Sequence, residues 1–228
     1  MTYPYINPSE YPKVLGDRIK MNTTSHWESV YASKDVNEVS WFQAYPTQSI
    51  DLIQRSGIAK QSNIIDIGGG TSSLVDKLLI EGFESISVLD ISSKALEKSK
   101  HRLGKKSKQV QWIIGDVLKM DLPLQCFDLW HDRAAMHFLI DVNDRQVYRS
   151  KVLASLKPGG FIAILTFAED GPDRSSGLQV QQFSIDTLSH EFGKNFCLVA
   201  GEKHSHCTPG GMEQRFLSCL FQLTGAHE

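Results

Sequence analysis

The stretch that decides the fold is NIIDIGGGTSS, residues 63–73, in which a short apolar run is followed by three glycines. An apolar run bounded by glycine is typical of a buried strand. Gly68 and Gly70 remove side chains where the backbone must turn sharply and approach a ligand. Ser73 with Asp76 resembles a capping box, which predicts that a helix begins here. Together, strand, glycine turn and helix predict a loop that binds a nucleotide cofactor.

The loop alone leaves two cofactors open. A dinucleotide site favours G-x-G-x-x-G, and this chain has Gly68 and Gly70 but Ser73 in place of the third glycine. The next predicted strand, residues 86–90, ends in Asp90. A carboxylate at that place can accept hydrogen bonds from both ribose hydroxyls of either NAD or S-adenosylmethionine.

Later strands separate these two readings. A predicted strand over 110–114 leads into Gly115-Asp116, another over 127–130 leads into His131-Asp132-Arg133, and LKPGG at 156–160 precedes a strand over 161–166. With Asp66 before the first glycine, this order resembles the class I S-adenosylmethionine-dependent methyltransferases over roughly residues 25–225. Ser72 departs from the family pattern, which has a third glycine there.

The resemblance implies an α/β fold, a Rossmann-like, doubly wound, mostly parallel seven-stranded sheet that ends in a C-terminal antiparallel hairpin. It implies S-adenosyl-L-methionine as methyl donor and S-adenosyl-L-homocysteine as product. Gly68 and Gly70 are expected at the methionyl part, Asp90 at the ribose, and Asp116 at the adenine. The full implied donor-binding set is Trp41, Asp66, Gly68, Gly69, Gly70, Asp90, Ile91, Asp116, Val117 and His131.

The acceptor side is expected after the fourth strand, and Asp132 and His137 are the candidate catalytic residues. A carboxylate could bind a substrate amine, and an imidazole can accept a proton near neutral pH. The alternatives are an ion pair for Asp132 and simple packing for His137. Glu169 and Asp170 follow the fifth strand and either line the same mouth or are solvated loop charges.

Aromatic residues are dense in HWESVY, residues 26–31, and VSWFQAY, residues 39–45. They either pack on the core or form a cap over the methyl donor. The segment is similar to the entry segment of bacterial methyltransferases and of elongation-factor and citrate-synthase lysine methyltransferases, which leaves the substrate open. We therefore expect an N-terminal arm and aromatic cap over residues 1–45 and the S-adenosylmethionine-binding domain over residues 46–228.

Composition narrows the class further. A chain of 228 residues with 41% hydrophobic content fits one sizeable core, and a net charge of −2 gives no general attraction to nucleic acid. No apolar stretch reaches the ~20 residues of a membrane span. The lysine-rich stretch 98–108 is interpreted as a solvated helix end. The N-terminus lacks a targeting pattern, so a cytoplasmic protein is expected.

Metal and disulfide readings are disfavoured. The four cysteines contain no C-x-x-C pair, and His204, His206 and Cys207 lack an evident fourth ligand.

The sequence thus predicts in-line methyl transfer to an unspecified acceptor, either a small molecule or a protein lysine. The alternatives are a non-catalytic S-adenosylmethionine-binding regulatory module and an NAD-dependent oxidoreductase.

Overall fold

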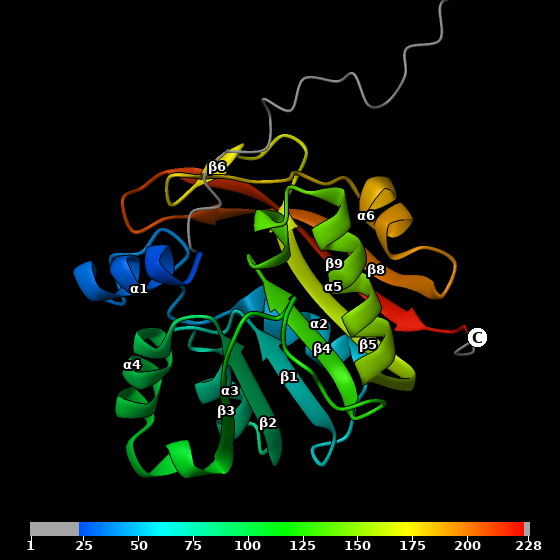
Figure 1. Cartoon of the computed structure of the whole chain (residues 1–228), viewed down its shortest axis with the longest axis horizontal. Helices are drawn as coiled ribbons and strands as arrows, with labels where there is room; N and C mark the ends of the chain where they lie inside the picture. The colour runs from blue at the N-terminus through cyan, green and yellow to red at the C-terminus, as the bar shows by residue number, and fades with distance from the viewer. Residues whose placement is uncertain (1–22, 226–228) are drawn as a thin grey trace, which may run out of the picture.

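The computed structural model of the protein describes residues 23–225 and is built around one seven-stranded sheet (Figure 1). The strand order is β3-β2-β1-β4-β5-β9-β8; the first five strands are mutually parallel, and β9 is antiparallel to both of its neighbours. This confirms the predicted sheet with its C-terminal hairpin. The strands are β1 Asn63–Ile67, β2 Ser85–Asp90, β3 Val110–Ile114, β4 Phe127–Arg133, β5 Leu156–Phe167, β8 Phe196–Cys207 and β9 Glu213–Leu223.

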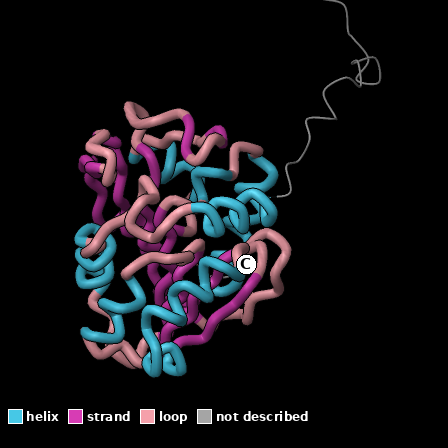
Figure 2. Tube along the Cα trace, turned by 90° about the vertical axis from the view of Figure 1, so that its left-hand side faces the viewer, coloured by secondary structure: helices cyan, strands magenta, loops and turns pink. Residues whose placement is uncertain are grey.

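Helices cover both faces of the sheet (Figure 2). On one face Ile50, Leu74 and Leu96, from three different helices, are buried in a shared core, and on the other face Tyr148 and Leu188 do the same. The helices are α1 Thr23–Ser33, α2 Thr47–Ser56, α3 Leu74–Ile80, α4 Ser93–Leu103, α5 Val142–Ser155 and α6 Ile185–Phe192, with short 3-10 turns η3 Gly104–Gln109 and η4 Met136–Phe138. A small separate hairpin pairs β6 Arg174–Ser175 with β7 Leu178–Gln179.

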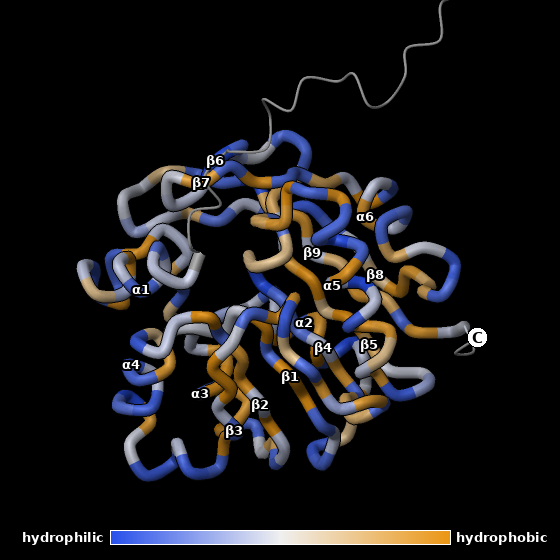
Figure 3. Tube along the Cα trace, viewed as in Figure 1, coloured by the Kyte–Doolittle hydropathy of each residue, from blue (hydrophilic) through white to orange (hydrophobic). Residues whose placement is uncertain are grey.

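The central strands are apolar because both of their faces are covered. In β1, Ile64 faces one core and Ile65 and Ile67 face the other, and all three are at most 1% exposed. Hydropathy follows the same plan, with hydrophobic residues along the strands and hydrophilic residues in the loops (Figure 3). A parallel sheet of this kind requires near-continuous apolar strands, which is what the sequence pattern indicated.

Several helix boundaries follow the sequence signals. α2 ends at Gly57, whose φ of 68° lies in the left-handed region. α6 begins after Ser184, whose side chain accepts a hydrogen bond from Thr187 N, and it ends at Gly193.

Two local predictions are wrong. The expected capping box at α3 does not form, because Ser73 Oγ donates to Gln43 O and Asp76 pairs with Arg102. The LKPGG segment is not a turn before the fifth strand but its first part, since Leu156 already pairs with Phe127 of β4.

The strand order indicates at which edge of the sheet a ligand is expected to bind. β1 lies between β2 and β4. From β1 the chain first adds β2 and β3 on one side of the sheet, and then crosses back to add β4 and β5 on the other side. Ligands of such sheets bind beyond the carboxyl ends of the strands, at the point where the order reverses. That point lies between the ends of β1 and β4.

No helix of residues 23–225 is long and apolar enough to cross a membrane. The same residues contain no group of three or more histidine, cysteine or acidic side chains arranged to hold a metal ion.

Candidate functional site

The glycine loop at the end of β1 is fitted tightly against β2. Gly68 N donates to Leu89 O at 2.8 Å. Gly68 and Gly70 have φ values of 63° and 44°, which favour glycine. A Cβ on Gly69 would lie 2.6 Å from Asp66 Oδ2, too close for any side chain. The positive φ values and the close protein neighbours therefore both require glycine in this loop.

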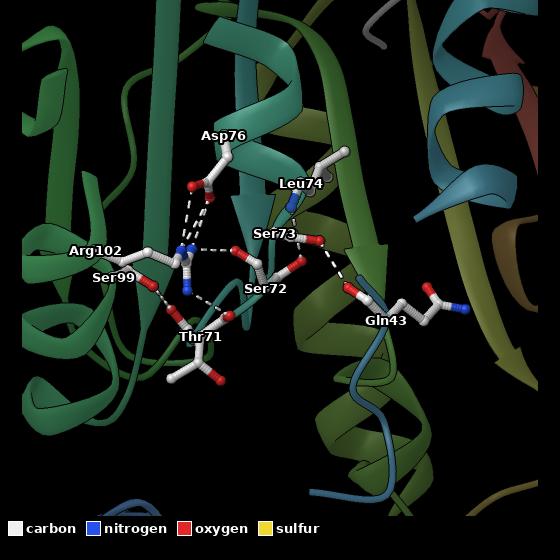
Figure 4. A network of polar contacts seen from close by, with 9 residues as sticks. Gln43, Thr71, Ser72, Ser73, Leu74, Asp76, Ser99 and Arg102 are labelled. Atoms are coloured by element: carbon white, nitrogen blue, oxygen red, sulfur yellow. Dashed lines mark hydrogen bonds and ion pairs between the residues drawn. The ribbon is translucent and has the colours of Figure 1, made fainter. Parts of the chain in front are cut away.

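Helix α4 holds this loop from the outside (Figure 4). Arg102 donates from Nη1 to Thr71 O at 2.9 Å and from Nη2 to Ser72 O at 2.7 Å, and it pairs with Asp76 at 2.8 Å. Ser99 Oγ donates to the Gly70 carbonyl oxygen at 2.7 Å. Arg102 belongs to the cationic stretch interpreted as a solvated helix end, so part of that stretch instead fixes the loop.

The acid of the loop is held by a buried chain of polar groups. Asp66 Oδ1 lies 2.7 Å from His131 Nδ1, and His131 Nε2 lies 2.9 Å from Ser49 Oγ. All three residues are at most 3% exposed. The order of carboxylate, imidazole and hydroxyl resembles a hydrolytic triad, but Ser49 is too buried to meet a substrate. These two hydrogen bonds instead orient the carboxylate of Asp66, and the His131 side chain links it to Ser49.

Asp90 ends β2 next to the same loop and is 5% exposed. Its Oδ1 accepts a hydrogen bond from Ser92 N at 2.7 Å. Burial is the main reason that the pKa of Asp90 is raised to about 7, and the nearby Asp66 adds to the effect. A Cβ on Gly70 would lie 2.6 Å from the Tyr31 hydroxyl oxygen and 3.1 Å from Asp90 Oδ2, so Tyr31 closes this corner.

Asp116 follows β3 and completes the row of acids. Its Oδ1 accepts from Leu118 N at 3.0 Å, and its Oδ2 lies 3.0 Å from Lys119 Nζ. Gly115 N donates to Asp90 O at 2.9 Å, which ties the ends of β2 and β3 together. Because β1, β2 and β3 are adjacent, the structure brings the glycine loop and the acids together along one edge. The neighbouring Ile91 and Val117 are half-buried.

Asp132, expected to meet the acceptor, is fully buried and engaged. It accepts hydrogen bonds from Ala135 N at 2.9 Å, from Met136 N, and from the Tyr148 hydroxyl at 2.6 Å. Ala134, two residues after Asp132, has a φ of 66°, an uncommon conformation for alanine. These contacts engage both carboxylate oxygens of Asp132 in holding the turn at the end of β4, and its contact with an acceptor stays a prediction.

His137 is also buried, but its ring nitrogens are not satisfied. The ring stacks on Phe167 with centroids 4.6 Å apart and meets the edge of Phe138 at 4.5 Å. Neither nitrogen has a hydrogen-bond partner among the described residues. Burial lowers the pKa of His137 to about 3, so the imidazole is neutral at physiological pH. The packing alternative accounts for the ring but not for its two unpartnered nitrogens.

The aromatic segment lies over the strand ends as a cap. Trp27 contacts Trp41 at a centroid distance of 5.8 Å, and Tyr31 contacts Trp41 at 6.1 Å. Helix α1 is docked beside the start of α4 (Figure 1), where Glu28 Oε1 accepts from Ser93 N at 2.6 Å and from Ser93 Oγ at 2.9 Å. Glu28 Oε2 is buried without a partner among the described residues.

Sequence reasoning did not single out Arg133 as a site residue. Its Nη1 donates to Trp41 O at 2.9 Å, and no ion pair of the described residues includes it. Burial lowers the pKa of this guanidinium, while Asp66 and Tyr31 act in the opposite direction. Its place at the end of β4, the strand beside the switch point, is the signal that could have identified it.

The remaining candidates lie at the rim. Glu169 pairs with Lys203, and Asp170 lies within reach of both Lys203 and Arg215. They are therefore paired surface charges. His206 Nε2 donates to Ser40 O at 2.7 Å, which joins β8 to the cap segment.

Residues 64–160 match the family described as "Methyltransferase domain". The ubiquinone/menaquinone biosynthesis C-methyltransferase UbiE of Francisella tularensis subsp. novicida is 27% identical over 63% of this chain and 58% of that protein, so this chain spans less than two thirds of its length. EEF1A lysine methyltransferase 2 of Danio rerio is 25% identical over 64% of this chain and 68% of that protein.

Among solved structures, the 1,6-didemethyltoxoflavin-N1-methyltransferase of Burkholderia thailandensis superposes with a TM-score of 0.68. It is 20% identical and covers 99% of this chain and 94% of its own. Likeness at this level of identity establishes the fold.

Proposed function

The chain carries a class I S-adenosylmethionine-dependent methyltransferase domain, and from this premise we propose that it transfers a methyl group to a small-molecule or protein-lysine acceptor. The observation that carries the proposal is the row of groups at the ends of three adjacent strands. A bare glycine loop after β1, Asp90 after β2 and Asp116 after β3 stand in the order that the methyl donor needs.

The residues present fit this donor chemically. Carboxylates accept hydrogen bonds, and the donor offers hydroxyls on its ribose and an amine on its adenine. We assign Asp90 to the ribose and Asp116, with Val117 beside it, to the adenine. The unpartnered Glu28 Oε2 is a further buried acceptor. Glu28 binds Ser93, which follows Asp90 by three residues, so this acceptor lies on the same side as the proposed ribose site. We assign Gly68 to Gly70, with Asp66 behind them, to the methionyl end.

When bound, S-adenosylmethionine supplies a methyl group on a positively charged sulfur, which needs no further activation. The protein's task is to align the acceptor and to exclude water. Trp27, Tyr31 and Trp41 supply the apolar cover. Because the Tyr31 hydroxyl lies in the corner formed by Gly70 and Asp90, we infer that this side chain moves aside when the donor binds.

On the acceptor side we assign His137 a contact through its unpartnered nitrogens and Asp132 a positioning role through the turn at Ala134. The division into a cap within residues 1–45 and a domain from residue 46 is supported by the docking of α1 on α4. Residues 1–22 of the expected arm lie outside the described part. A cytoplasmic location stays a prediction.

Calorimetry with S-adenosylhomocysteine tests the proposed site. Replacing Asp90 with alanine removes two hydrogen bonds to the ribose, each contributing about 1.5–3 kcal/mol. We expect the Kd of Asp90→Ala to rise by about a hundredfold or more, while Asp121→Ala, a change at a fully exposed aspartate, leaves it unchanged. An unaltered affinity of Asp90→Ala contradicts the assignment.

A donor-binding module without transfer activity is the second candidate. It is favoured by one observation, that neither Asp132 nor His137 is placed as a base with an ordinary pKa. Incubation with methyl-labelled donor and cell lysate separates the two functions, since only an enzyme moves the label to an acceptor.

A further inference from the structure

The charges around the acceptor side indicate the class of acceptor. Arg133 stands at the end of β4 with one hydrogen bond, to Trp41 O at 2.9 Å, and no carboxylate among the described residues forms an ion pair with it. The charge of Asp66 raises the pKa of the Arg133 guanidinium, but Asp66 Oδ1 is already hydrogen-bonded to His131. A partly buried cation without a paired anion is costly, and an anionic ligand would remove that cost.

The carboxylates near the ends of β4 and β5 are all engaged. Asp132 accepts hydrogen bonds from two backbone amides and from Tyr148. Glu169 and Asp170 face Lys203 and Arg215 at the rim.

Asp90 and Glu28 lie on the donor side. Asp90 accepts a hydrogen bond from Ser92 N, and Glu28 binds Ser93 at the start of α4. Among residues 23–225, therefore, no unengaged carboxylate at the ends of β4 and β5 offers a counter-charge to the ammonium of a protein lysine.

The rest of this surface is aromatic. A continuous row of rings runs from the cap to β9, with centroid distances of 5.1 Å from Trp27 to Phe138, 4.5 Å from Phe138 to His137, 4.6 Å from His137 to Phe167, and 4.7 Å from Phe167 to Phe216. We call these five residues the aromatic row. His137, Phe167 and Phe216 are at most 3% exposed, so the half-buried rings of Trp27 and Phe138 are the part that a ligand can contact. Such rings favour a flat apolar partner.

Unpartnered polar atoms accompany the aromatic row. Both ring nitrogens of His137 and the hydroxyl of Thr166 are buried without a hydrogen-bond partner among the described residues. His137 and Thr166 are each 1% exposed. Buried polar groups in folded proteins are nearly always bonded, so these atoms point to a ligand with polar substituents.

We propose that the acceptor is a small molecule with a flat apolar body and an anionic nucleophile, which Arg133 holds against Trp27 and Phe138, the half-buried end of the aromatic row. This inference rests on the proposed methyltransferase function. A lone pair of the anion forms the bond to the methyl carbon, and the electrons of the carbon–sulfur bond return to sulfur, which becomes a neutral thioether. Because the nucleophile binds as an anion, no proton remains to be removed and no general base is required.

The first arm of the test follows the label. The full-length protein is incubated with methyl-labelled donor and cell lysate, and the products are separated into protein and small molecules. We expect label in small molecules whose unmethylated forms are retained by an anion exchanger. Label in methyllysine, or in small cationic amines, overturns the inference. Label in neither fraction, with S-adenosylhomocysteine still bound, overturns the proposed function and the inference with it.

The second arm assigns Arg133. Arg133→Gln should lower kcat/KM for the labelled small-molecule fraction by about tenfold or more, and Arg133→Lys should recover part of the loss. The S-adenosylhomocysteine Kd of Arg133→Gln should stay within about twofold of wild type. A tenfold weaker Kd assigns the guanidinium to the donor and overturns the inference. Arg55→Gln, on the exposed side of α2, is the matched control.

Discussion

Replacing Asp90 with asparagine should make the protein more stable at alkaline pH while it impairs donor binding. Asp90 is 5% exposed, and burial raises its pKa from 3.8 to about 7. A carboxyl group whose pKa is raised on folding stabilises the fold below its unfolded pKa, and this stability is lost as the pH rises through the folded pKa. The window therefore runs from about pH 4 to pH 7. Asparagine carries no charge and removes the loss.

The size of the effect follows from the two pKa values. At pH 5 the buried carboxyl is still protonated in the folded protein, and the loss of stability relative to acid pH is only about 2 kcal/mol. At pH 8 the full difference of about 3 units applies, or about 4 kcal/mol. Between these pH values the free energy of unfolding of Asp90→Asn should thus gain about 2–3 kcal/mol relative to wild type.

Urea unfolding of both proteins at pH 5 and pH 8 measures this difference. Asp121→Asn, at a fully exposed position, is the control and should show no comparable change. A stability difference that is the same at the two pH values, or that shifts in favour of wild type at pH 8, refutes the reasoning. The same variant should bind S-adenosylhomocysteine more weakly, because an amide is a poorer acceptor for two ribose hydroxyls.

Three further predictions concern the surroundings of the site. Gly69→Ala places a Cβ 2.6 Å from both Asp66 Oδ2 and Val88 Cγ1, so it should cost about 1–3 kcal/mol in urea unfolding, whereas Gly210→Ala, with no atom closer than 3.8 Å, should be near neutral. His131→Ala removes both hydrogen bonds of the buried imidazole, leaves Asp66 Oδ1 without its partner and opens a cavity, so it should cost about 3–5 kcal/mol; wild-type stability would disprove this. Tyr148→Phe should cost about 1–3 kcal/mol yet keep S-adenosylhomocysteine affinity, and a tenfold weaker Kd argues against a structural Asp132.

The fold was predictable from the sequence because its signals are local. The apolar run before Gly68, the strand that ends in Asp90 and the capped helix after Ser184 each depend on a few adjacent residues. The order of these elements along the chain, together with the family resemblance, then indicated the sheet and its functional edge.

The parts that could not be predicted depend on contacts between distant segments. Ser73 bonds Gln43 and not its own helix, because the cap segment lies against the loop. Asp132 accepts a hydrogen bond from Tyr148 of α5, and no local sequence pattern predicts this contact. Arg133 is a candidate for binding the acceptor because of its contact with Trp41, which lies far from it in sequence.

The central claim is that the ends of β1, β2 and β3 hold S-adenosylmethionine. Calorimetric titration of the full-length protein with S-adenosylhomocysteine and, separately, with NADH tests it most directly. We predict saturable one-to-one binding of S-adenosylhomocysteine, weakened in Asp90→Ala, and no binding of NADH. Binding of NADH without binding of S-adenosylhomocysteine would contradict the account.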